Sequence, residues 1–552
     1  VKRRDFIKDF AYTGIGLTVP AYLSSCSNLF DQAGPGKEYK ADIIIVGGGL
    51  GACAAALSAC KQGASVIMTE PTDWIGGQVS QQGVPPDEHQ WIESFGRTEN
   101  YARFRTLIRD YYRKNYRLSN TALQSEYLNP GNGMVSRLCH EPKVALAVLQ
   151  SMLEPFIVSG NLRLFLNTKP VKAHVDADRV QSVSCLNIES DDKTVFIGDM
   201  FIDASEEGDL LPLTRTEYIL GAESRLITGE PHAPEKADPG NIQALTWCFA
   251  MDHLEGEDHT IEKPATYDFW KNHIPDLMPE WSGKLLSLNY SNPRTLEPRA
   301  LSFVPPAKAS PAPLTSSLNL WLYRRIIDKN NFETGSFESD ITLVNWPQND
   351  YMLGNITDVP DNLRDHNLNQ ARQLSMSLLY WLQTEVPRPD GKQGWKGLRL
   401  RKDMFGTDDG LAKYPYIRES RRIKAEFTVK EQHLSLEERK KAYPDDDNLI
   451  LGTPFHDSVG IGYYHLELHP STGGDNYIDM ASVPFQIPLG AIIPQRMENI
   501  IPACKNIGTT HISNGCYRLH PVEWSIGEAA GHLCAYSIRK NIQPRDIRNN
   551  PC

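Results

Sequence analysis

The sequence contains little cysteine, no excess of positive charge and no run of apolar residues that would make a multi-span membrane protein. Its ten cysteines are too few for a disulfide scaffold in 552 residues, and none forms the Cys-x-x-Cys pair typical of zinc or thioredoxin-like sites. Lys and Arg total 57 against 68 Asp and Glu, so the formal net charge is −11 and nucleic acid is not an expected partner. A hydrophobic content of 40% predicts a large globular protein.

The first 30 residues have the pattern of an export signal. An arginine pair at 3–4 precedes an apolar run over 11–23, which is shorter than the about 20 residues that cross a bilayer. The pair resembles the twin-arginine signal of proteins exported in the folded state, and the LSSC segment ending at Cys26 resembles a bacterial lipobox. We therefore expect a periplasmic or cell-envelope protein that touches the membrane only through this signal or a lipid on Cys26. A tether over 31–40 follows; a plain peptidase site and an amphipathic cytosolic helix are the alternatives.

Residues 41–70 have the order of a dinucleotide-binding unit. The β-branched run 41–46 predicts a strand buried on both faces. Residues 47–52 read GGGLGA and fit the G-x-G-x-x-G/A pattern, and 53–61 continue as a helix rich in alanine. A second strand over 64–70 follows. The full order is much more specific than a glycine cluster alone, for which a turn without a ligand is the alternative.

Each position of this motif has a physical role. Gly47 makes the tight turn, Gly49 lets the backbone approach a pyrophosphate, and Ala52 allows close packing of the helix. Free N–H groups at the start of that helix, where Gly51 lies, hold phosphates. Glu70 ends the second strand and is placed to accept hydrogen bonds from an adenosine ribose; its charge argues against a cofactor with a 2′-phosphate.

A second glycine motif narrows the cofactor to FAD. Gly76, Gly77 and Gln78 follow the ribose acid closely. The pair of glycines resembles the second fingerprint of flavoproteins of the glutathione-reductase-like superfamily, in which the chain passes close to the pyrophosphate and the flavin. Without that context the pair would indicate only a turn.

The region after residue 131 predicts a helix and then a small antiparallel ribbon. The helix lies within 131–153, and the strands are expected at 162–171, 180–188 and 194–202. Residues 201–210 resemble the segment that returns the chain to the FAD fold in the same superfamily, although Ser205 and Glu206 replace its usual Thr-Gly. The resemblance implies cofactor contacts at Val171, Ala204 and Ser205.

The carboxy-terminal residues resemble the end of the same fold. Segments 488–494 and 499–504 resemble its last strand, and 511–521 the loop beneath the flavin. A helix is predicted over 522–540, with Pro521 in its first turn. The positive end of such a helix stabilises the negative charge of a reduced flavin, so Pro521 is expected beside the cofactor.

Three interior segments resemble a bacterial group called FAD-dependent oxidoreductases, many of them exported. These segments are 344–351, 416–423 and 457–462. Residues 503–506 read ACKN where the group commonly has Ala-Gly-Arg-Cys.

The resemblance implies an α/β fold with a discontinuous Rossmann-like FAD-binding domain. This domain would comprise 41–215 and 481–552, with an inserted α+β substrate or cap region over 216–480. Whether that region is one domain or two is left open.

Candidate catalytic residues lie on a short alternating segment. A strand there would place His465, Glu467 and His469 on one face. Oxidation of a carbinol or amine carbon needs a base for the accompanying proton, and imidazole suits that task. His511 and His520 are rival bases. For each histidine a structural role is the alternative, and a metal face would need further ligands, so no metal is expected.

Two further groups have open interpretations. Arg418, in a run with Arg421 and Arg422, is either part of a solvated charge cluster or an anchor for an anionic substrate or the reduced cofactor. Cys504 and Cys516 are candidates for a covalent link to the flavin, but buried free thiols are commoner.

Together these patterns predict an exported FAD-dependent oxidoreductase. Its substrate would be a small molecule bearing a hydroxyl or amine, sugar-derived compounds included, that gives a hydride to flavin N5. Only one nucleotide cradle is evident, so no site for NAD(P)H is assigned. Oxygen, a quinone and a redox protein are the candidate electron acceptors. The alternatives are a flavin-dependent reductase or a lyase or isomerase without net oxidation, and a non-catalytic surface lipoprotein that binds glycans.

Overall fold

The computed structural model describes residues 36–305, 318–444 and 451–549. The expected signal and Cys26 lie outside these residues, as does most of the expected tether over 31–40. The end of that tether is part of the fold, because strand β1 begins at Lys37 and pairs there with Thr194. In the described part, no helix combines the length and apolar character needed to span a bilayer.

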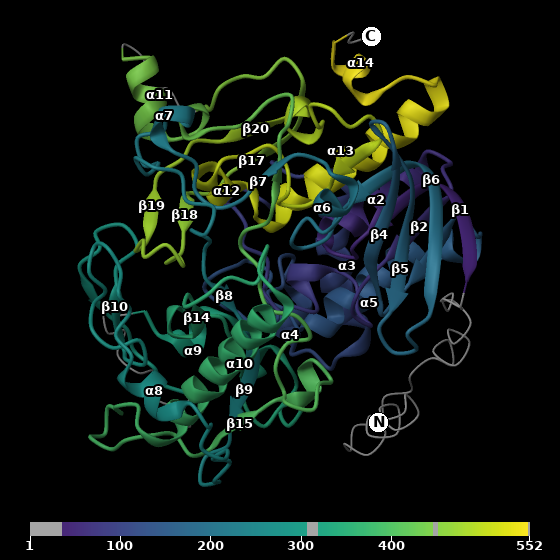
Figure 1. The fold of residues 1–552 in the computed structure, drawn as a ribbon. Coiled ribbons are helices and arrows are strands. Elements are labelled where there is room, and N and C mark those ends of the chain that lie inside the picture. Colours follow the sequence, from purple (N-terminus) through teal and green to yellow (C-terminus); the bar gives the residue numbers. More distant parts are fainter. Residues whose placement is uncertain (1–35, 306–317, 445–450, 550–552) are drawn as a thin grey trace.

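A seven-stranded sheet forms the centre of the amino-terminal part (Figure 1). Its strands are β1 (Lys37–Val46), β2 (Val66–Thr69), β3 (Leu162–Phe165), β4 (Thr168–Asp176), β5 (Arg179–Asn187), β6 (Lys193–Asp203) and β21 (Ile500–Pro502). The order is β3-β2-β1-β6-β5-β4, with β21 beside β6; β1, β2, β3, β6 and β21 are parallel. Because β21 comes from the far end of the chain, the predicted α/β, discontinuous Rossmann-like fold is confirmed.

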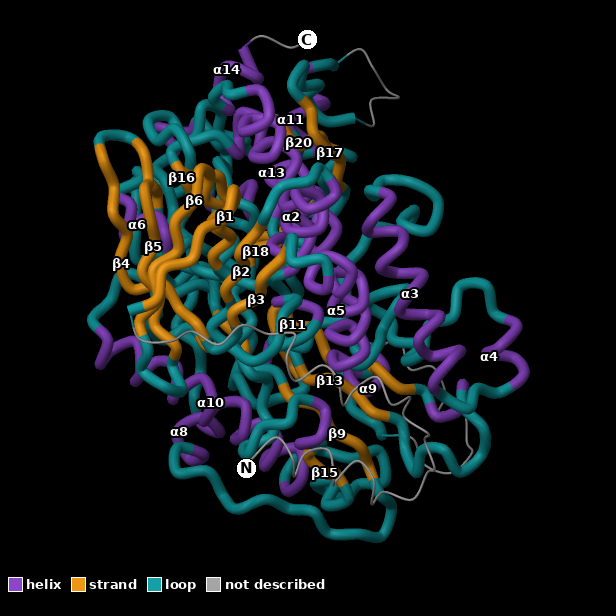
Figure 2. Tube along the Cα trace, turned by 90° about the vertical axis from the view of Figure 1, so that its right-hand side faces the viewer, coloured by secondary structure: helices purple, strands orange, loops and turns teal. Residues whose placement is uncertain are grey.

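The buried run in β1 explains why this strand lies inside the sheet. Ile43 and Ile45 face one core cluster, whereas Ile44 and Val46 face another, and all four are fully buried. The first cluster lies under four helices, which share one side of the sheet (Figure 2). These helices are α2 (Leu50–Lys61), α3 (Glu99–Asn115), α5 (Pro142–Val158) and α13 (His520–Lys540). The α13 helix packs directly against α2.

The first strand of the antiparallel ribbon begins later than predicted. Strands β4, β5 and β6 form the ribbon, but the first expected strand is divided at Asn167, which has a φ of +54°. The part before this residue is β3, which pairs in parallel with β2. Asn167 donates its N–H to the Thr72 carbonyl, and this contact ends β3 beside the loop after β2.

The middle of the chain forms a separate antiparallel sheet, as the α+β prediction requires. Its order is β12-β13-β9-β15, and the long helix α10 packs against the short helix α8 (Figure 1). These elements are β9 (Phe249–His253), β12 (Arg325–Ile327), β13 (Ile341–Val344), β15 (Leu398–Leu400), α8 (Tyr267–Asn272) and α10 (Asp361–Thr384). The proposed domain boundaries at 215 and 481 stay predictions.

Short elements connect these parts. Further helices are α4 (Asn120–Gln124), α6 (Leu210–Thr214), α7 (Arg225–Thr228), α9 (Leu320–Tyr323), α11 (Leu436–Ala442), α12 (His511–Tyr517) and α14 (Pro544–Asn549). Further strands are β7 (Tyr218–Ile219), β8 (Leu245–Thr246), β10 (Asn289–Ser291), β11 (Pro298–Ala300), β14 (Asp350–Tyr351), β16 (Arg422–Ile423), β17 (Ser458–Gly462), β18 (Leu466–Leu468), β19 (Ile478–Met480) and β20 (Phe485–Pro488).

The segment 511–521 is not the loop that the sequence predicted. Helix α12 occupies most of it, because the side chains of Thr510 and Ser513 cap its first turn reciprocally. The α13 helix then begins at His520, two residues earlier than predicted, with Pro521 in its first turn as expected.

Candidate functional site

The turn between β1 and α2 is so tight that only glycine fits at two positions. Gly47 has a φ of +96°, and a Cβ atom there would lie 2.4 Å from the Ala204 carbonyl oxygen. A Cβ atom at Gly51 would lie 1.8 Å from the Ala503 carbonyl oxygen. The ends of β6 and β21 therefore pack against this turn, and Ala204 lies beside the glycine motif.

Gly49 lies at the amino end of α2, close to two carboxylates. It is the N-cap residue, and no side chain caps the helix through it. A Cβ atom at Gly49 would lie 3.1 Å from Glu206 Oε1 and 3.5 Å from Glu523 Oε1. Gly51 donates its N–H to Glu523 at 3.1 Å, and Ala52 is fully buried under the neighbouring helix. Contrary to the prediction from the sequence, the N–H of Gly51 is therefore not free for a phosphate, because the Glu523 carboxylate accepts it.

Glu70 lies directly beneath this turn. One carboxylate oxygen accepts the N–H of Gly48 at 2.8 Å, and the other accepts the N–H and hydroxyl of Thr72, both at 2.8 Å. Burial raises the pKa of Glu70 to about 7, although these hydrogen bonds favour the charged form. The acid is thus fixed in orientation, as a ribose-binding carboxylate must be.

The second glycine motif contacts the first. Gly76, with a φ of +110°, donates its N–H to the Gly48 carbonyl at 2.7 Å. A Cβ atom at Gly77 would lie 3.0 Å from Gly49 Cα. Gln78 donates to the carboxylate of Glu523 and to the Arg518 carbonyl oxygen. The structure therefore brings Gly76, Gly77 and Gln78 into the cradle formed by the first motif.

Other predicted cofactor positions differ in their surroundings. Ser205 is buried at the end of β6, where its hydroxyl donates to Asp203 at 2.6 Å. Pro521 is buried at the start of α13. Val171 lies in a bulge on β4, the outer strand of the ribbon, and its side chain is 37% exposed. The structure does not place that side chain among the residues of the cradle.

The cradle also contains charged groups that the sequence did not assign. Lys505 forms a buried ion pair with Glu206, and its ammonium lies 3.3 Å from Cys504 Sγ. Within the described residues, Glu206 Oε1 and Gln78 Oε1 are buried acceptors without a hydrogen-bond partner. Hydroxyl groups of FAD would supply donors to these atoms, and Lys505 would offset the charge of its diphosphate. The residues present therefore fit FAD.

The thiols near this site are in the protonated form. Burial raises the pKa of Cys504 well above its ordinary value, and nearby Glu523 adds to this effect. Burial likewise raises the pKa of Cys516. Since the thiolate is the nucleophile, these surroundings do not favour a covalent link to the flavin.

A second polar group is centred on Asp350, in β14. This carboxylate is fully buried and accepts hydrogen bonds from Arg418 at 2.9 Å, from His469 Nδ1 at 2.6 Å and from Thr246 Oγ1 at 2.5 Å. Arg418 also donates to the Ala244 carbonyl oxygen at 2.7 Å. The interpretation of Arg418 as part of a solvated charge run is wrong, because this side chain is buried and paired.

Glu467 lies beside this group and close to the start of α13. Its Oε2 atom is 4.0 Å from His469 Nε2, 3.7 Å from Arg518 and 3.4 Å from the Tyr464 hydroxyl. Although burial opposes ionisation, the positive charges of His465 and Arg518 lower the pKa of Glu467 to about 2. The expected shared face of Glu467 and His469 is present.

The other predicted histidines have different partners. His465 Nδ1 is 2.5 Å from Asp479, and His511 Nδ1 is 2.9 Å from Glu419. His520 is fully buried at the start of α13, where its Nδ1 accepts the N–H of Asp87 at 3.0 Å. The structure thus brings Arg418 and Glu467 into one neighbourhood, with His465 at its edge, whereas His511 and His520 belong to separate networks.

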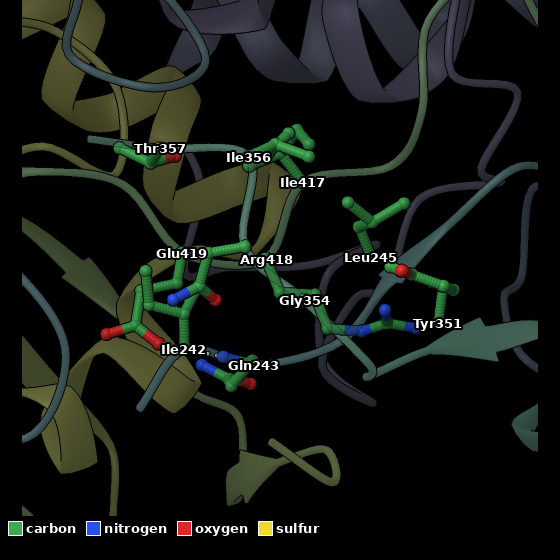
Figure 3. Close-up of a pocket in the computed structure, with 11 residues that line it drawn as sticks. Ile242, Gln243, Leu245, Tyr351, Gly354, Ile356, Thr357, Ile417, Arg418 and Glu419 are labelled. Atoms are coloured by element: carbon green, nitrogen blue, oxygen red, sulfur yellow. Dashed lines mark hydrogen bonds between the residues drawn. The ribbon is translucent and has the colours of Figure 1, made fainter. Parts of the chain in front are cut away.

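Arg418 also lines a small cavity (Figure 3). It has a volume of about 20 Å³, and Gln243, Glu419 and Thr357 are among its lining residues. This is room for a single water molecule. The buried Gln243 Nε2 has no hydrogen-bond partner in the described part of the chain and would bind such a water. The cavity is too small for a substrate.

Several site residues were missed from the sequence. Asp350 and Arg518 lie in segments that resemble the family, but no local pattern marks them as partners of His469 and Glu467. Lys505 was noted only within a departure from the group's usual sequence. For Lys505, the signal available in the sequence was a charged residue shortly after an otherwise apolar strand.

These features define a class of protein, an enzyme that holds a dinucleotide cofactor in a glycine cradle beside a buried cluster of charged side chains. Residues 42–551 match the family described as FAD dependent oxidoreductase, and the chain belongs to that family. It is an FAD-dependent oxidoreductase, so it uses a small-molecule substrate and an electron acceptor. Comparison with curated proteins gave no match.

Comparison with solved structures gave matches to a dehydrogenase, a fumarate reductase and a reductase-like protein, all of low identity. L-proline dehydrogenase from P. horikoshii is 14% identical, with a TM-score of 0.17 over 34% of this chain, which spans only 24% of that protein. E. coli quinol fumarate reductase is 11% identical, with a TM-score of 0.34 over 92% of this chain and 71% of that one. A geranylgeranyl bacteriochlorophyll reductase-like protein from Thermoplasma acidophilum is 9% identical, with a TM-score of 0.32 over 91% and 80%.

Proposed function

We propose that this enzyme oxidises a small substrate bearing a hydroxyl or amine, and that the substrate binds at the cluster of Glu467, Arg418 and Arg518. The observation that carries this proposal is the direct link between cluster and cradle. Gln78 of the second glycine motif donates to the Arg518 carbonyl at 3.0 Å, and the Arg518 guanidinium lies 3.7 Å from Glu467. When bound, FAD supplies the acceptor for a hydride and its two electrons.

The protein's own residues provide orientation and proton acceptance. Arg518 donates to the Tyr416 hydroxyl at 2.9 Å, and its Nε is a buried donor without a partner among the described residues. Glu467 offers an ionised acceptor that is held only by long contacts. Such a group of unsatisfied donors and acceptors suits a polar substrate that completes their hydrogen bonds.

A partly exposed aromatic group supports sugar-derived compounds as substrates. The rings of Trp91 and Tyr463 are 5.0 Å apart, and Trp91 stacks on Phe95 at 5.6 Å. Phe95 is 54% exposed. Tyr463 immediately precedes Tyr464, whose hydroxyl contacts Glu467, so this aromatic group flanks the proposed substrate site. Planar rings suit the apolar face of a sugar.

Export and lipidation of Cys26 are part of the same proposal, and the amino-terminal pattern supports them. Replacement of the arginine pair by lysine, R3K/R4K, should retain the protein in the cytoplasm. Cys26→Ala should abolish incorporation of radiolabelled palmitate. Unchanged localisation and labelling in both variants would contradict export by this route.

The proposed activity is tested by mixing the FAD-loaded protein with candidate alcohols, sugars and amines in the absence of oxygen. At least one compound should bleach the absorbance of the oxidised flavin by reducing it. Binding of compounds without bleaching by any of them would instead favour a lyase, an isomerase or a glycan-binding protein. Dioxygen, a quinone analogue and a redox protein are then tested as reoxidants of the bleached enzyme.

A further inference from the structure

The hydrogen bonds of the histidines near the site fix where each imidazole holds its proton. A base for a substrate proton must be neutral and must have an acceptor nitrogen that faces the substrate. His465, His511 and His520 are the rival bases that the sequence predicts. Their contacts, together with those of His469, distinguish among them.

His469 is held by Asp350 through Nδ1, at 2.6 Å. Asp350 is also paired with Arg418, and although burial opposes its ionisation, this arginine and His469 lower its pKa. An ionised carboxylate accepts a hydrogen bond, so the proton of a neutral His469 lies on Nδ1 and the lone pair lies on Nε2. The same arrangement orients the imidazole of a catalytic triad.

His469 Nε2 makes no hydrogen bond within the described residues and faces Glu467 Oε2 at 4.0 Å. Neither atom carries a proton, so no hydrogen bond can form between these two acceptors. The contacts of Glu467 with Tyr464 and Arg518, at 3.4 and 3.7 Å, are also long. A ligand O–H or N–H placed between His469 Nε2 and Glu467 Oε2 would provide the missing donor.

The groups around His469 leave it neutral near pH 7. Burial lowers its pKa and Arg418 adds to this effect, while Asp350 and Glu467 act in the opposite direction. The ring of Tyr477, at 5.4 Å, is its aromatic neighbour and carries no charge, because burial raises the pKa of that phenol well above its usual value.

The rival histidines lack this combination. Although burial favours the neutral form, Asp479 raises the pKa of His465 and Glu419 raises that of His511, so both tend to be charged. His520 is neutral because of its burial, but its Nδ1 already accepts the Asp87 N–H, which places its proton on Nε2. The remaining ring nitrogen of His520, Nε2, is thus a donor and cannot take a proton from a substrate.

We propose that His469, oriented by Asp350, takes the proton from the substrate hydroxyl or amine, and that Glu467 holds the same group by a second contact. This proposal rests on the proposed function. The substrate O–H or N–H bond breaks and its proton passes to His469 Nε2. The adjacent C–H bond breaks with loss of a hydride to oxidised FAD, and a C=O or C=N bond forms. Asp350 is a positioning residue.

The first test uses the FAD-loaded enzyme and the best substrate from the anaerobic screen. His469→Gln should slow flavin bleaching by about 100-fold or more while FAD content stays unchanged. The bleaching rate of the wild type should fall at low pH, where His469 becomes protonated. This fall, the acid limb of the pH profile, should be absent in the variant. Asp350→Asn should shift that limb as well as slow bleaching. His174→Gln, in the ribbon, is the matched control and should bleach at the wild-type rate. Bleaching by His469→Gln at the wild-type rate would overturn the proposal.

The second test needs no substrate. Protein labelled with nitrogen-15 at histidine is titrated by NMR, and the His469 signals are those lost in His469→Gln. We expect a neutral ring with its proton on Nδ1 and a pKa below that of free histidine. A charged ring at pH 7, or a proton on Nε2, would overturn the proposal. If no compound bleaches the flavin while these signals are as expected, the proposed oxidation fails and the assigned proton position stands.

Discussion

Gly527 crosses Gly51 so closely that a Cβ atom at position 527 would lie 2.1 Å from the Gly51 carbonyl oxygen. This contact fixes helix α13 against the start of α2. It joins the end of the chain, which carries the helix dipole expected at the flavin, to the glycine motif near its beginning. The site therefore depends on a backbone approach between two helices that are distant in sequence.

Gly527→Ala should separate these helices. The added methyl group meets backbone atoms, which cannot rotate away, so we expect a loss of about 1–3 kcal/mol in the free energy of unfolding and a lower FAD content. Urea denaturation and flavin absorbance measure the two effects. Ala529→Ser, on a partly exposed position of the same helix, is the control and should cost about 0.5 kcal/mol or less. Equal behaviour of the two variants would contradict the account.

Glu70→Gln should weaken FAD binding by about tenfold or more. The carboxylate accepts the N–H groups of Gly48 and Thr72 through different oxygens, so one of them would meet the amide nitrogen, a donor, in the variant. Titration of the FAD-depleted protein with FAD gives the dissociation constant. Retention of wild-type affinity would show that the orientation of this acid is unimportant.

Glu70 also predicts a pH dependence for the FAD-depleted protein. Its folded pKa is raised to about 7 from an unfolded value near 4.5, so the folded state binds the proton more tightly between these values. The stability of the wild type relative to Glu70→Gln should fall as pH rises from about 4.5 to 7 and then stay constant. Unfolding curves across this range measure the difference. A difference that is constant, or that rises with pH, would be inconsistent with the buried acid.

Lys505→Met should leave Glu206 as a buried charge without its cation. Breaking such a pair costs about 3–5 kcal/mol, and the cradle should also hold FAD less tightly. The double variant Glu206→Gln/Lys505→Met removes both charges and should recover part of the stability but not the FAD affinity. Denaturation and FAD titration of the single and double variants form a thermodynamic cycle. Additive effects on stability would show that the two residues are not coupled.

The sequence was informative where the structural signal is local. The unit from β1 to Glu70, and Pro521 at the start of α13, were predicted because glycine spacing, β-branched runs and helix starts depend on neighbouring residues. The pair of Asp350 and His469 joins residues 119 positions apart, and the pair of Gly51 and Glu523 joins residues 472 apart. No pattern in one sequence specifies such pairs.

The incorrect predictions have physical causes of the same kind. Helix α12 replaced the expected loop because a reciprocal cap formed at Thr510, and the first expected ribbon strand is divided because Asn167 adopts a left-handed conformation. The sequence did not decide whether Arg418 is exposed to solvent or lies in the site, since a run of arginines has the same composition in either place. Its burial against Asp350 comes from a strand of the inserted region.

The central claim is that the glycine cradle and the Glu467 cluster are two ends of one active site. A crystal structure of the FAD-loaded enzyme tests it most directly. The account predicts electron density for the diphosphate along the turn of Gly47 and Gly49, and for the flavin ring between the start of α13 and Glu467. Density for FAD elsewhere, or a flavin ring remote from Glu467 and His469, would contradict it.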